Sequence, residues 1–301
     1  MQETKKIWMD GEFYDWKDAN VHILTHTLHY GLGVFEGIRC YSTKKGTAVF
    51  RLKEHVRRLF ESAHIMEMKI PFKEEEIFKA IVDTIKINEL SSGYIRPLVY
   101  LGYGQMGLNP KNSPVRAAIA VWPWGKYLGE GQDGIRTMVS SYTRLHSNIF
   151  MTKAKVCGGY VNSILAKCEA LNNGYDEAIL LDPEGFVAEG TGENVFIIKN
   201  GKLKTPPMDN SLCGITRDTI FKITGGKYEI EEKRFSRDEL YIADEVFLTG
   251  TAAEITAVKE VDHRKIGPGK TGPITKLIEE QFYNIVNGKN KKFENWLTYV
   301  K

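Results

Sequence analysis

The segment Pro123–Gly131 constrains the fold most strongly, because it interrupts the periodic pattern of hydrophobic residues on both sides. Its sequence, PWGKYLGEG, combines a proline with three glycines, and such residues mark loops and linkers rather than helices or strands. A chain of 301 residues is long enough for two hydrophobic cores. We therefore expect a small domain over residues 1–122, a linker over 123–134 and a larger domain over 135–301.

Strand and helix signals alternate in the first domain. Asp10-Gly11 is the favoured two-residue hairpin turn, which predicts a hairpin over residues 6–16. Apolar residues at helical spacing predict helices over 53–63 and 74–90. Arg51 lies where a strand passes into the first of these helices, a position that suits either a surface ion pair or a contact to phosphate.

The second domain begins with a strand at 135–142 and contains a helix at 160–172, a hairpin at 178–189 and a last helix at 271–286. Gly214-Ile215-Thr216 opens a further short helix, whose unpaired backbone amides form a candidate anion site. After the strand that precedes Thr249, Thr251-x-x-Glu254 has the capping-box spacing, which predicts a second helix start and a second anion site.

Charge and cysteine content exclude several functional classes. The net charge of +3 is thinly spread, so we expect no nucleic-acid partner. The four cysteines form no C-x-x-C pair, which favours free thiols in a reducing compartment. The N-terminal residues include no apolar signal segment, and no run of 18 apolar residues occurs. The sequence predicts a cytoplasmic protein with no membrane partner.

Lys155 is the leading candidate for a reactive group. It lies among small and apolar residues and is followed by Gly158, Gly159 and Tyr160. Glycines let the backbone approach another group closely. An amine that loses part of its hydration becomes a usable nucleophile and base, which is what pyridoxal phosphate chemistry requires of a lysine. The alternative, a lysine in solvent, is the usual state of this residue type.

Two apparent motifs carry less weight. Residues 102–107 match G-x-G-x-x-G, but the sequence LNPKNSP follows, and its prolines prevent the helix that a dinucleotide site needs. His22, His26 and His29 lack further ligands at zinc spacing, so we expect no metal. In the bend at 189–194, Glu189 and Glu193 are either solvated acids or partners of a protonated pyridine ring.

The order of motifs resembles one family over nearly the whole chain. The pieces are YGLGVFEGIR, FRLKEH, YIRP, GLNP, EGTGENVF, GITRD and LYIADEVFLTGTAAEIT. Together they are similar to the branched-chain amino acid aminotransferases, which are fold-type IV (class IV) pyridoxal phosphate enzymes. The resemblance implies an α+β, D-amino acid aminotransferase-like fold, with a small α/β domain and a larger β-barrel-like domain that carries the lysine.

The resemblance also implies roles for individual residues. Lys155 would be the catalytic lysine that bonds to the aldehyde of pyridoxal 5′-phosphate and serves as the base. Tyr160 would bind the phenolic oxygen of the cofactor, and Glu189 its pyridine nitrogen. The residues expected at the cofactor phosphate are Arg51, Ile215, Thr216 and Thr251. Glu193 would play a supporting part.

On the substrate side, the resemblance implies that one set of residues holds the carboxylate groups and another forms the apolar side-chain pocket. The carboxylate set is Tyr94, Arg96 and the backbone of Thr251 and Ala252; the pocket set is Phe35, Tyr30, Gly37 and Trp124, with Met106 and Leu108 from a partner subunit. The expected substrates are leucine, isoleucine and valine as L-amino acids, with L-glutamate and 2-oxo acids. A homodimer or higher homo-oligomer is implied.

Three alternatives stay open at this point. D-amino acid aminotransferases and aminodeoxychorismate lyases of the same fold share the lysine, the glutamate and the phosphate threonine. Tyr94-Ile95-Arg96-Pro97 and Gly107-Leu108-Asn109-Pro110 favour the branched-chain, L-specific branch. A non-enzymatic dinucleotide-binding module using residues 102–107 is the third alternative.

Overall fold

The computed structural model describes residues 2–125, 127–128 and 133–301. By packing, these residues fall into two compact units. The first contains the chain up to Gly125, together with Ala154–Gly159 and Asn284–Lys301, and the second contains the rest of the described chain up to Tyr283. The domain boundaries expected from the sequence stay a prediction. Residues 154–159 and 284–301 pack with the first unit, although both segments were expected in the larger domain.

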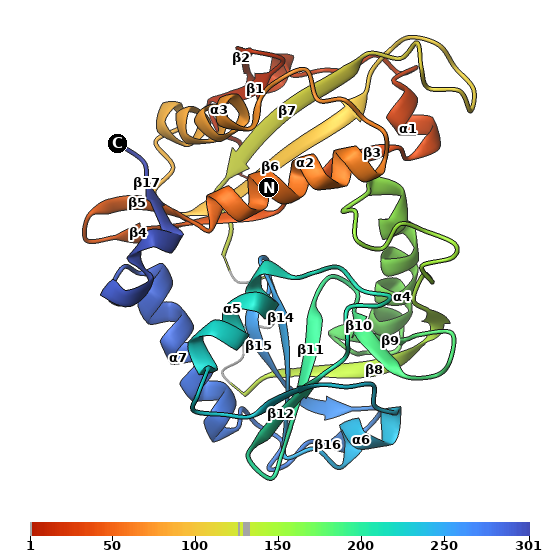
Figure 1. Ribbon diagram of the computed structural model, residues 1–301, viewed down its shortest axis with the longest axis vertical. Helices are drawn as coiled ribbons and strands as arrows, with labels where there is room; N and C mark the ends of the chain where they lie inside the picture. The colour runs from red at the N-terminus through yellow and green to blue at the C-terminus, as the bar shows by residue number, and fades with distance from the viewer. Residues whose placement is uncertain (1, 126, 129–132) are drawn as a thin grey trace. The chain divides into compact units, whose positions relative to one another are not determined.

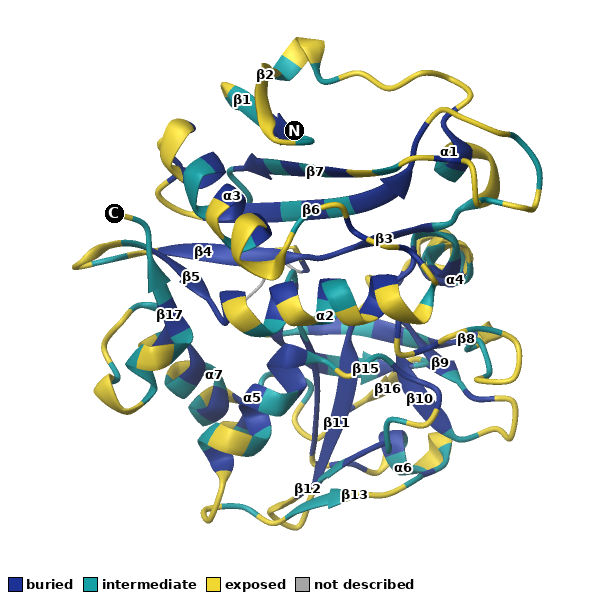
Figure 2. Ribbon diagram, turned by 45° about the horizontal axis from the view of Figure 1, so that its top comes forward, coloured by how far each residue is buried: buried dark blue, intermediate teal, exposed yellow. Residues whose placement is uncertain are grey.

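The first unit is built on an antiparallel sheet. Its strand order is β17-β5-β4-β6-β7-β1-β2, with β3 also paired to β6. The strands are β1 (Lys6–Met9), β2 (Glu12–Asp15), β3 (Gly33–Phe35), β4 (Ile38–Thr43), β5 (Gly46–Phe50), β6 (Gly93–Leu101), β7 (Val115–Trp122) and β17 (Leu297–Tyr299). The central strands β4 and β6 are largely buried, whereas the edge strand β2 is exposed (Figure 2).

Two amphipathic helices pack on this sheet. Helix α2 (Leu52–Ile65) contacts β3, and α3 (Glu74–Ile87) contacts β1 and β7. Buried apolar residues recur at helical spacing in both, which is the pattern that predicted them. Lys73 is the N-cap of helix α3, and its backbone N–H donates to the Glu76 carboxylate at 2.7 Å. The short helix α1 (His26–Tyr30) ends at Gly31, which adopts the left-handed conformation with φ of 73°.

The second unit contains a mixed sheet in the order β10-β9-β8-β15-β14-β11-β12-β13, with β16 paired to β15. All of these strands except β13 are labelled in Figure 1. The strands are β8 (Ile135–Thr143), β9 (Glu177–Leu181), β10 (Val187–Gly190), β11 (Asn194–Lys199), β12 (Lys202–Thr205), β13 (Ile230–Glu232), β14 (Glu245–Gly250), β15 (Glu254–Val261) and β16 (Arg264–Lys265). Pairs β8–β9, β8–β15 and β12–β13 are parallel, and the others are antiparallel.

Apolar side chains from these strands form one core cluster, which includes Val139, Ile179, Val195, Val246 and Val258. The helices of this unit are α4 (Tyr160–Asn172), α5 (Ile215–Thr224), α6 (Arg237–Tyr241) and α7 (Pro273–Val286), the last of which ends in the first unit. Helix α4 contacts β8 and β9, and α5 contacts β14. Phe196 stacks on Phe247 across β11 and β14, with ring centroids 4.9 Å apart.

The α+β prediction is confirmed, and the expected elements agree closely with the observed ones. The predicted helix at 160–172 matches α4 residue for residue, and residues 6–15 form the predicted hairpin. The capping-box prediction at Thr251 is wrong: Gly250 pairs with Glu254, so residues 251–253 form the turn of a β-hairpin. The Thr-x-x-Glu spacing is local, and strand pairing overrides it.

Candidate active site

Lys155 is held by its backbone within the first unit. Its N–H donates to Ser62 Oγ at 3.0 Å, and its carbonyl accepts from the Phe35 N–H at 3.0 Å. Gly158 N–H donates to the Gly31 carbonyl at 3.0 Å, and a Cβ on Gly31 would lie 3.0 Å from the Gly158 Cα. The glycines therefore permit the close backbone approach that the sequence suggested. The half-buried Lys155 side chain places Nζ 5.0 Å from the centre of the Phe35 ring.

His55 and Arg58, on the same face of α2 as Ser62, form a charged triad with Glu36. Glu36, which directly follows β3, is fully buried and accepts from His55 Nδ1 at 2.7 Å and from Arg58 Nε at 2.6 Å. Burial would raise the pKa of Glu36, but Arg58 and His55 hold it well below its usual range. Burial lowers the pKa of His55 against the opposing effect of Glu36, and the charge of Lys155 adds to the lowering.

This triad was not recognised in the sequence, and Arg51 was predicted as the arginine at the cofactor phosphate. Arg51 is the N-cap of α2, with φ of 51°; its Nε donates to Glu54 at 2.7 Å, and its guanidinium lies 4.9 Å from the Trp296 ring centre. Along the helix, Arg58 is about 6 Å from Ser62, whereas Arg51 is about 16 Å away. Arg58 is thus the arginine of α2 on the Lys155 side. The helical spacing of His55, Arg58 and Ser62 in the sequence was the available signal.

Several of the predicted substrate residues converge in the first unit. The Arg96 guanidinium lies 4.7 Å from the ring centre of Phe35, 5.3 Å from that of Tyr94 and 6.0 Å from that of Trp122. Such an aromatic setting suits a weakly hydrated guanidinium. Within the described part of the chain, the buried Arg96 Nε has no hydrogen-bond partner. A buried donor of this kind fits a ligand that brings its own acceptor, such as a carboxylate.

Gly37 lies against the end of the Tyr94 side chain. A Cβ on Gly37 would come within 1.9 Å of Tyr94 Oη, so only glycine fits at this position. The Tyr94 ring in turn meets the Trp124 ring edge-on, with centroids 4.6 Å apart and an interplanar angle of 89°. Phe35, Gly37, Tyr94, Arg96 and Trp124 are thereby connected through contacts within one unit.

Three predicted substrate residues have other surroundings. Tyr30, at the end of α1, is 43% exposed, and its ring lies 4.6 Å from that of His26. Met106 and Leu108 lie in the loop 102–114, and Leu108 is 89% exposed. No helix occurs within residues 102–114, so the structural context of a dinucleotide-binding fingerprint is missing there. The roles of these three residues stay predictions.

In the second unit, Glu189 is a buried residue of β10 with an oriented carboxylate. Arg144 Nε donates to its Oε1 at 2.5 Å, and Asn194 Nδ2 donates to its Oε2 at 3.3 Å. The same amide nitrogen also donates to the Leu212 carbonyl at 3.2 Å. Arg144 was missed by the sequence analysis, because it is distant in sequence and no local pattern marks it. The arrangement supplies a carboxylate of fixed direction.

Glu193, which the sequence left as either solvated or functional, is 3% exposed, so the solvated interpretation is wrong. Burial, followed by the charge of Glu177, raises the pKa of Glu193 to about 8. Glu177 is itself fully buried, and it is paired with Lys167 at 2.8 Å and accepts from Thr191 Oγ at 2.7 Å.

The N-terminus of α5 has the features of an anion site. Ile215 and Thr216 occupy its first two positions, and its N-cap, Gly214, provides no side-chain hydrogen bond. The first N–H groups of a helix have no partner inside the helix, and they favour an anion. A Cβ on Gly214 would lie 1.9 Å from Asn194 Oδ1, so Asn194 contacts this turn as well as Glu189. Tyr160 is the first residue of α4.

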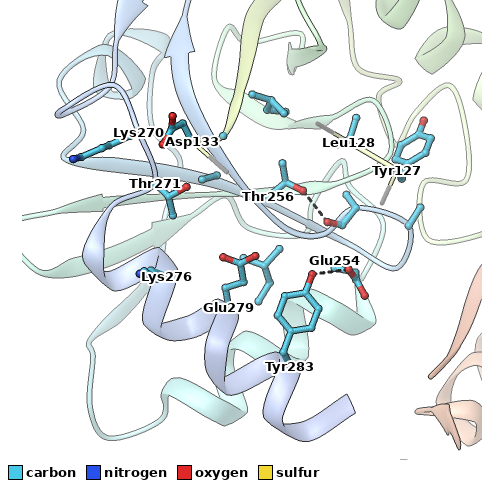
Figure 3. Close-up of a pocket in the computed structure, with 16 residues that line it drawn as sticks. Tyr127, Leu128, Asp133, Glu254, Thr256, Lys270, Thr271, Lys276, Glu279 and Tyr283 are labelled. Atoms are coloured by element: carbon cyan, nitrogen blue, oxygen red, sulfur yellow. Dashed lines mark hydrogen bonds between the residues drawn. The ribbon is translucent and has the colours of Figure 1, made fainter. Parts of the chain in front are cut away.

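The turn between β14 and β15 carries Thr251 and Ala252. Thr256 Oγ donates to the Ala253 carbonyl at 2.7 Å, and Tyr283 Oη donates to Glu254 at 2.8 Å (Figure 3). Ala252 and Ala253 line a cavity of about 450 Å³ that also receives side chains from α7. These hydrogen bonds fix the conformation of the turn that was predicted to meet the substrate.

Neither a metal site nor a membrane span emerges from the described ranges. No group of three or more histidine, cysteine, aspartate or glutamate side chains in residues 2–125, 127–128 and 133–301 is placed to hold a metal ion. In the same ranges, no helix combines the length and apolarity needed to cross a membrane.

Known proteins resemble this chain over its whole length. A family profile described as "Amino-transferase class IV" matches residues 33–261. The chain belongs to the class IV aminotransferases. Its relatives in this family include the branched-chain-amino-acid aminotransferase of Pseudomonas aeruginosa, with 52% identity covering 98% of this chain and 97% of that one. The enzyme of the same name from Escherichia coli K12 is 46% identical and covers 99% of both chains.

Solved class IV structures agree with the fold. The T.th. branched-chain amino acid aminotransferase, crystallised with pyridoxamine 5′-phosphate, has a TM-score of 0.97 and 47% identity, covering 100% of both chains. The same T.th. protein has been crystallised with N-(5′-phosphopyridoxyl)-L-glutamate. The Escherichia coli enzyme has a TM-score of 0.97 and 45% identity, covering 99% of this chain and 100% of that one. The family and fold type expected from the sequence motifs are confirmed.

Proposed function

We propose that this protein is a pyridoxal 5′-phosphate-dependent transaminase, which moves the α-amino group between branched-chain L-amino acids and 2-oxoglutarate. The observation that carries the proposal is the full-length identity of 46–52% to enzymes named branched-chain-amino-acid aminotransferase. The D-amino acid aminotransferase and lyase alternatives are not favoured by these relatives. The binding-module alternative lacks its helix.

The residues present fit the cofactor. Pyridoxal 5′-phosphate, when bound, supplies an aldehyde that takes up the amino group and a ring that accepts electrons from the substrate Cα. Lys155 would supply the amine for that aldehyde, Tyr160 a hydroxyl for the phenolic oxygen and Glu189 a carboxylate for the pyridine nitrogen. Arg144 and Asn194 support the last role, since they hold the Glu189 carboxylate in one direction.

The phosphate would be held by the first turn of α5, at Ile215 and Thr216, with Thr251 assisting. For the guanidinium, we propose Arg58 in place of Arg51. Arg58 is one helical turn from Ser62, whose hydroxyl binds the Lys155 backbone N–H. The Glu36 carboxylate accepts a hydrogen bond from Arg58 Nε and so orients the guanidinium.

The two arginines can be compared directly. An arginine–phosphate hydrogen bond is worth about 1.5–3 kcal/mol, so Arg58→Gln should raise the cofactor dissociation constant of the cofactor-free protein at least about tenfold. The matched variant Arg51→Gln should change it less than about threefold. Absorbance titration with the cofactor measures both dissociation constants. A larger loss of cofactor affinity in Arg51→Gln than in Arg58→Gln would favour Arg51 as the phosphate ligand.

Arg96 would bind a substrate carboxylate, which would complete the hydrogen bonding of its buried Nε. Phe35, Tyr94 and Trp124 would provide the apolar wall for an aliphatic side chain, and Gly37 leaves room beside Tyr94. Lys155 Nζ would act as the base that takes the proton from the substrate Cα.

Activity assays test the function. The purified protein should be yellow and should lose the colour with borohydride, and Lys155→Ala should be colourless. L-Leucine with 2-oxoglutarate should yield L-glutamate, while D-leucine and D-alanine should not react. Activity with D-alanine alone would reject the proposal in favour of the D-amino acid branch.

We also propose a homodimer or higher homo-oligomer in the cytoplasm. Leu108 is 89% exposed at the tip of its loop, and a second subunit would cover this side chain. Within the described residues, no disulfide includes Cys40, Cys157, Cys168 or Cys213, as a reducing compartment favours. Sedimentation velocity tests the assembly, and Leu108→Asp should weaken it if the loop lies in the interface.

A further inference from the structure

Glu193 lies between two backbone segments of the second unit. Its Oε2 accepts from the Gly192 N–H at 3.0 Å. A Cβ on Gly190 would lie 3.0 Å from the same oxygen, and a Cβ on Gly250 would lie 3.3 Å from the Glu193 Cγ. The side chain therefore fills the space between the bend that follows β10 and the end of β14.

These two segments carry residues of the proposed site. Glu189 directly precedes Gly190, and Thr251 directly follows Gly250. The Glu193 side chain thus touches the backbone next to the proposed pyridine partner and the backbone next to the proposed substrate turn. A change in the Glu193 side chain would therefore affect both the position of Glu189 and the position of the Thr251 turn.

The two acids near Glu193 are each paired with another cation, Glu177 with Lys167 and Glu189 with Arg144. Glu177 on β9 and Glu189 on β10 both oppose its ionisation, and Lys167 on α4 is the cation that favours it. Lys167 Nζ already pairs with Glu177 at 2.8 Å. Within the described residues, no ion pair includes Glu193. A buried acid with two acidic neighbours and no cation of its own is stable in its protonated form.

We propose that Glu193 is a positioning residue that works as a neutral carboxylic acid, holding the Glu189 bend and the Thr251 turn in register, and that its ionisation loosens both. This inference rests on the proposed function for the roles of Glu189 and Thr251. It assigns the protein an upper pH limit for tight cofactor binding, set by a side chain that does not itself touch the cofactor.

Thermal unfolding of the full-length protein tests the ionisation. Glu193→Gln keeps the shape and the acceptor for Gly192 but cannot ionise. The pKa of Glu193 is about 8 in the folded state against an ordinary 4.5, so the folded state holds a proton that the unfolded state releases, and stability falls as pH rises through this range. The melting temperature of Glu193→Gln should equal that of wild type at pH 4 and should be about 5 °C higher than that of wild type at pH 9.

Cofactor affinity tests the positioning. The cofactor dissociation constant of wild type should rise between pH 7 and pH 9 by more than that of Glu193→Gln. Glu193→Ala, which leaves a cavity, should bind cofactor more weakly at every pH. Glu61→Gln, on the exposed side of α2, controls for the substitution itself and should follow wild type.

The proposal would be overturned if the melting temperatures of wild type and Glu193→Gln changed with pH in the same way. An unchanged cofactor affinity in Glu193→Ala would also overturn it. These readouts do not depend on turnover. If wild type fails to transaminate L-leucine, the proposed function fails while the melting comparison still decides whether Glu193 is buried in its neutral form.

Discussion

Gly37→Ala is a sharp test of the substrate-side geometry. A Cβ at this position would lie 1.9 Å from Tyr94 Oη and 2.8 Å from Tyr94 Cζ, where ordinary contact begins at 3.4 Å. The tyrosine would have to withdraw by 1.5 Å, from 3.4 minus 1.9. Its ring is packed against Trp122 and Trp124, with centroids 5.2 and 4.6 Å away, so it has little room to move.

Overpacking of this kind costs about 1–3 kcal/mol. If Tyr94 and Arg96 bind the substrate as proposed, the displacement reaches the Arg96 guanidinium 5.3 Å from the Tyr94 ring. A displaced Arg96 would weaken its hydrogen bond to the substrate carboxylate, which is worth about 1.5–3 kcal/mol, so kcat/KM for L-leucine should fall about 10- to 150-fold. The melting temperature should fall as well, because the strain is present without substrate.

Tyr94→Phe provides the matched control. It removes the hydroxyl but leaves the ring carbon at 2.8 Å, so the required withdrawal drops to 0.6 Å, from 3.4 minus 2.8. Gly37→Ala should therefore cost less in the Tyr94→Phe background than in wild type, and a double-mutant cycle on kcat/KM and on melting temperature measures the difference. Additive effects, or a Gly37→Ala variant as active and stable as wild type, would refute this reasoning.

Further predictions concern the buried acid and the thiols. Glu36→Gln leaves His55 and Arg58 buried without their carboxylate and should lower the free energy of unfolding by about 3–5 kcal/mol in denaturant titrations. Because the folded-state pKa of Glu36 lies below its ordinary 4.5, its stabilisation is complete above that pH and is lost on acidification, so the variant should show a smaller loss of stability below pH 4.5 than wild type. Burial raises the pKa of the Cys157 thiol, whereas Cys168 and Cys213 are exposed. A thiol reagent at pH 7.5 should therefore modify Cys168 and Cys213 before Cys157, and the double variant Cys168→Ser/Cys213→Ser should remove the fast phase; a fast phase that survives in the double variant would contradict this assignment.

Local patterns predicted the elements well. The Asp10-Gly11 turn fixed the register of β1 and β2, and apolar spacing found α2 and α3. These signals depend on the preferences of neighbouring residues, which the sequence displays directly. Ordered motifs then supplied the family, because their joint occurrence over the chain is far more specific than any one of them.

Long-range pairings escaped the sequence. Glu36 meets Arg58 only because β3 packs on α2, and Arg144 meets Glu189 only because β8 and β10 both pair with β9 in one sheet. Glu193 looked like a loop residue because its burial depends on Gly250, which is 57 positions away. Such contacts have no local signature, so a charged side chain in a bend is indistinguishable from a solvated one until the chain is folded.

The last strand has a consequence for how the protein is made. β17 pairs with β5, and Arg51, at the start of α2, donates its N–H to the Trp296 carbonyl. One edge of the first sheet is therefore supplied by a strand that is synthesised long after β5, so this edge stays unpaired in the nascent chain until β17 has been made. Deletion of β17 should accordingly lower the solubility of the first unit.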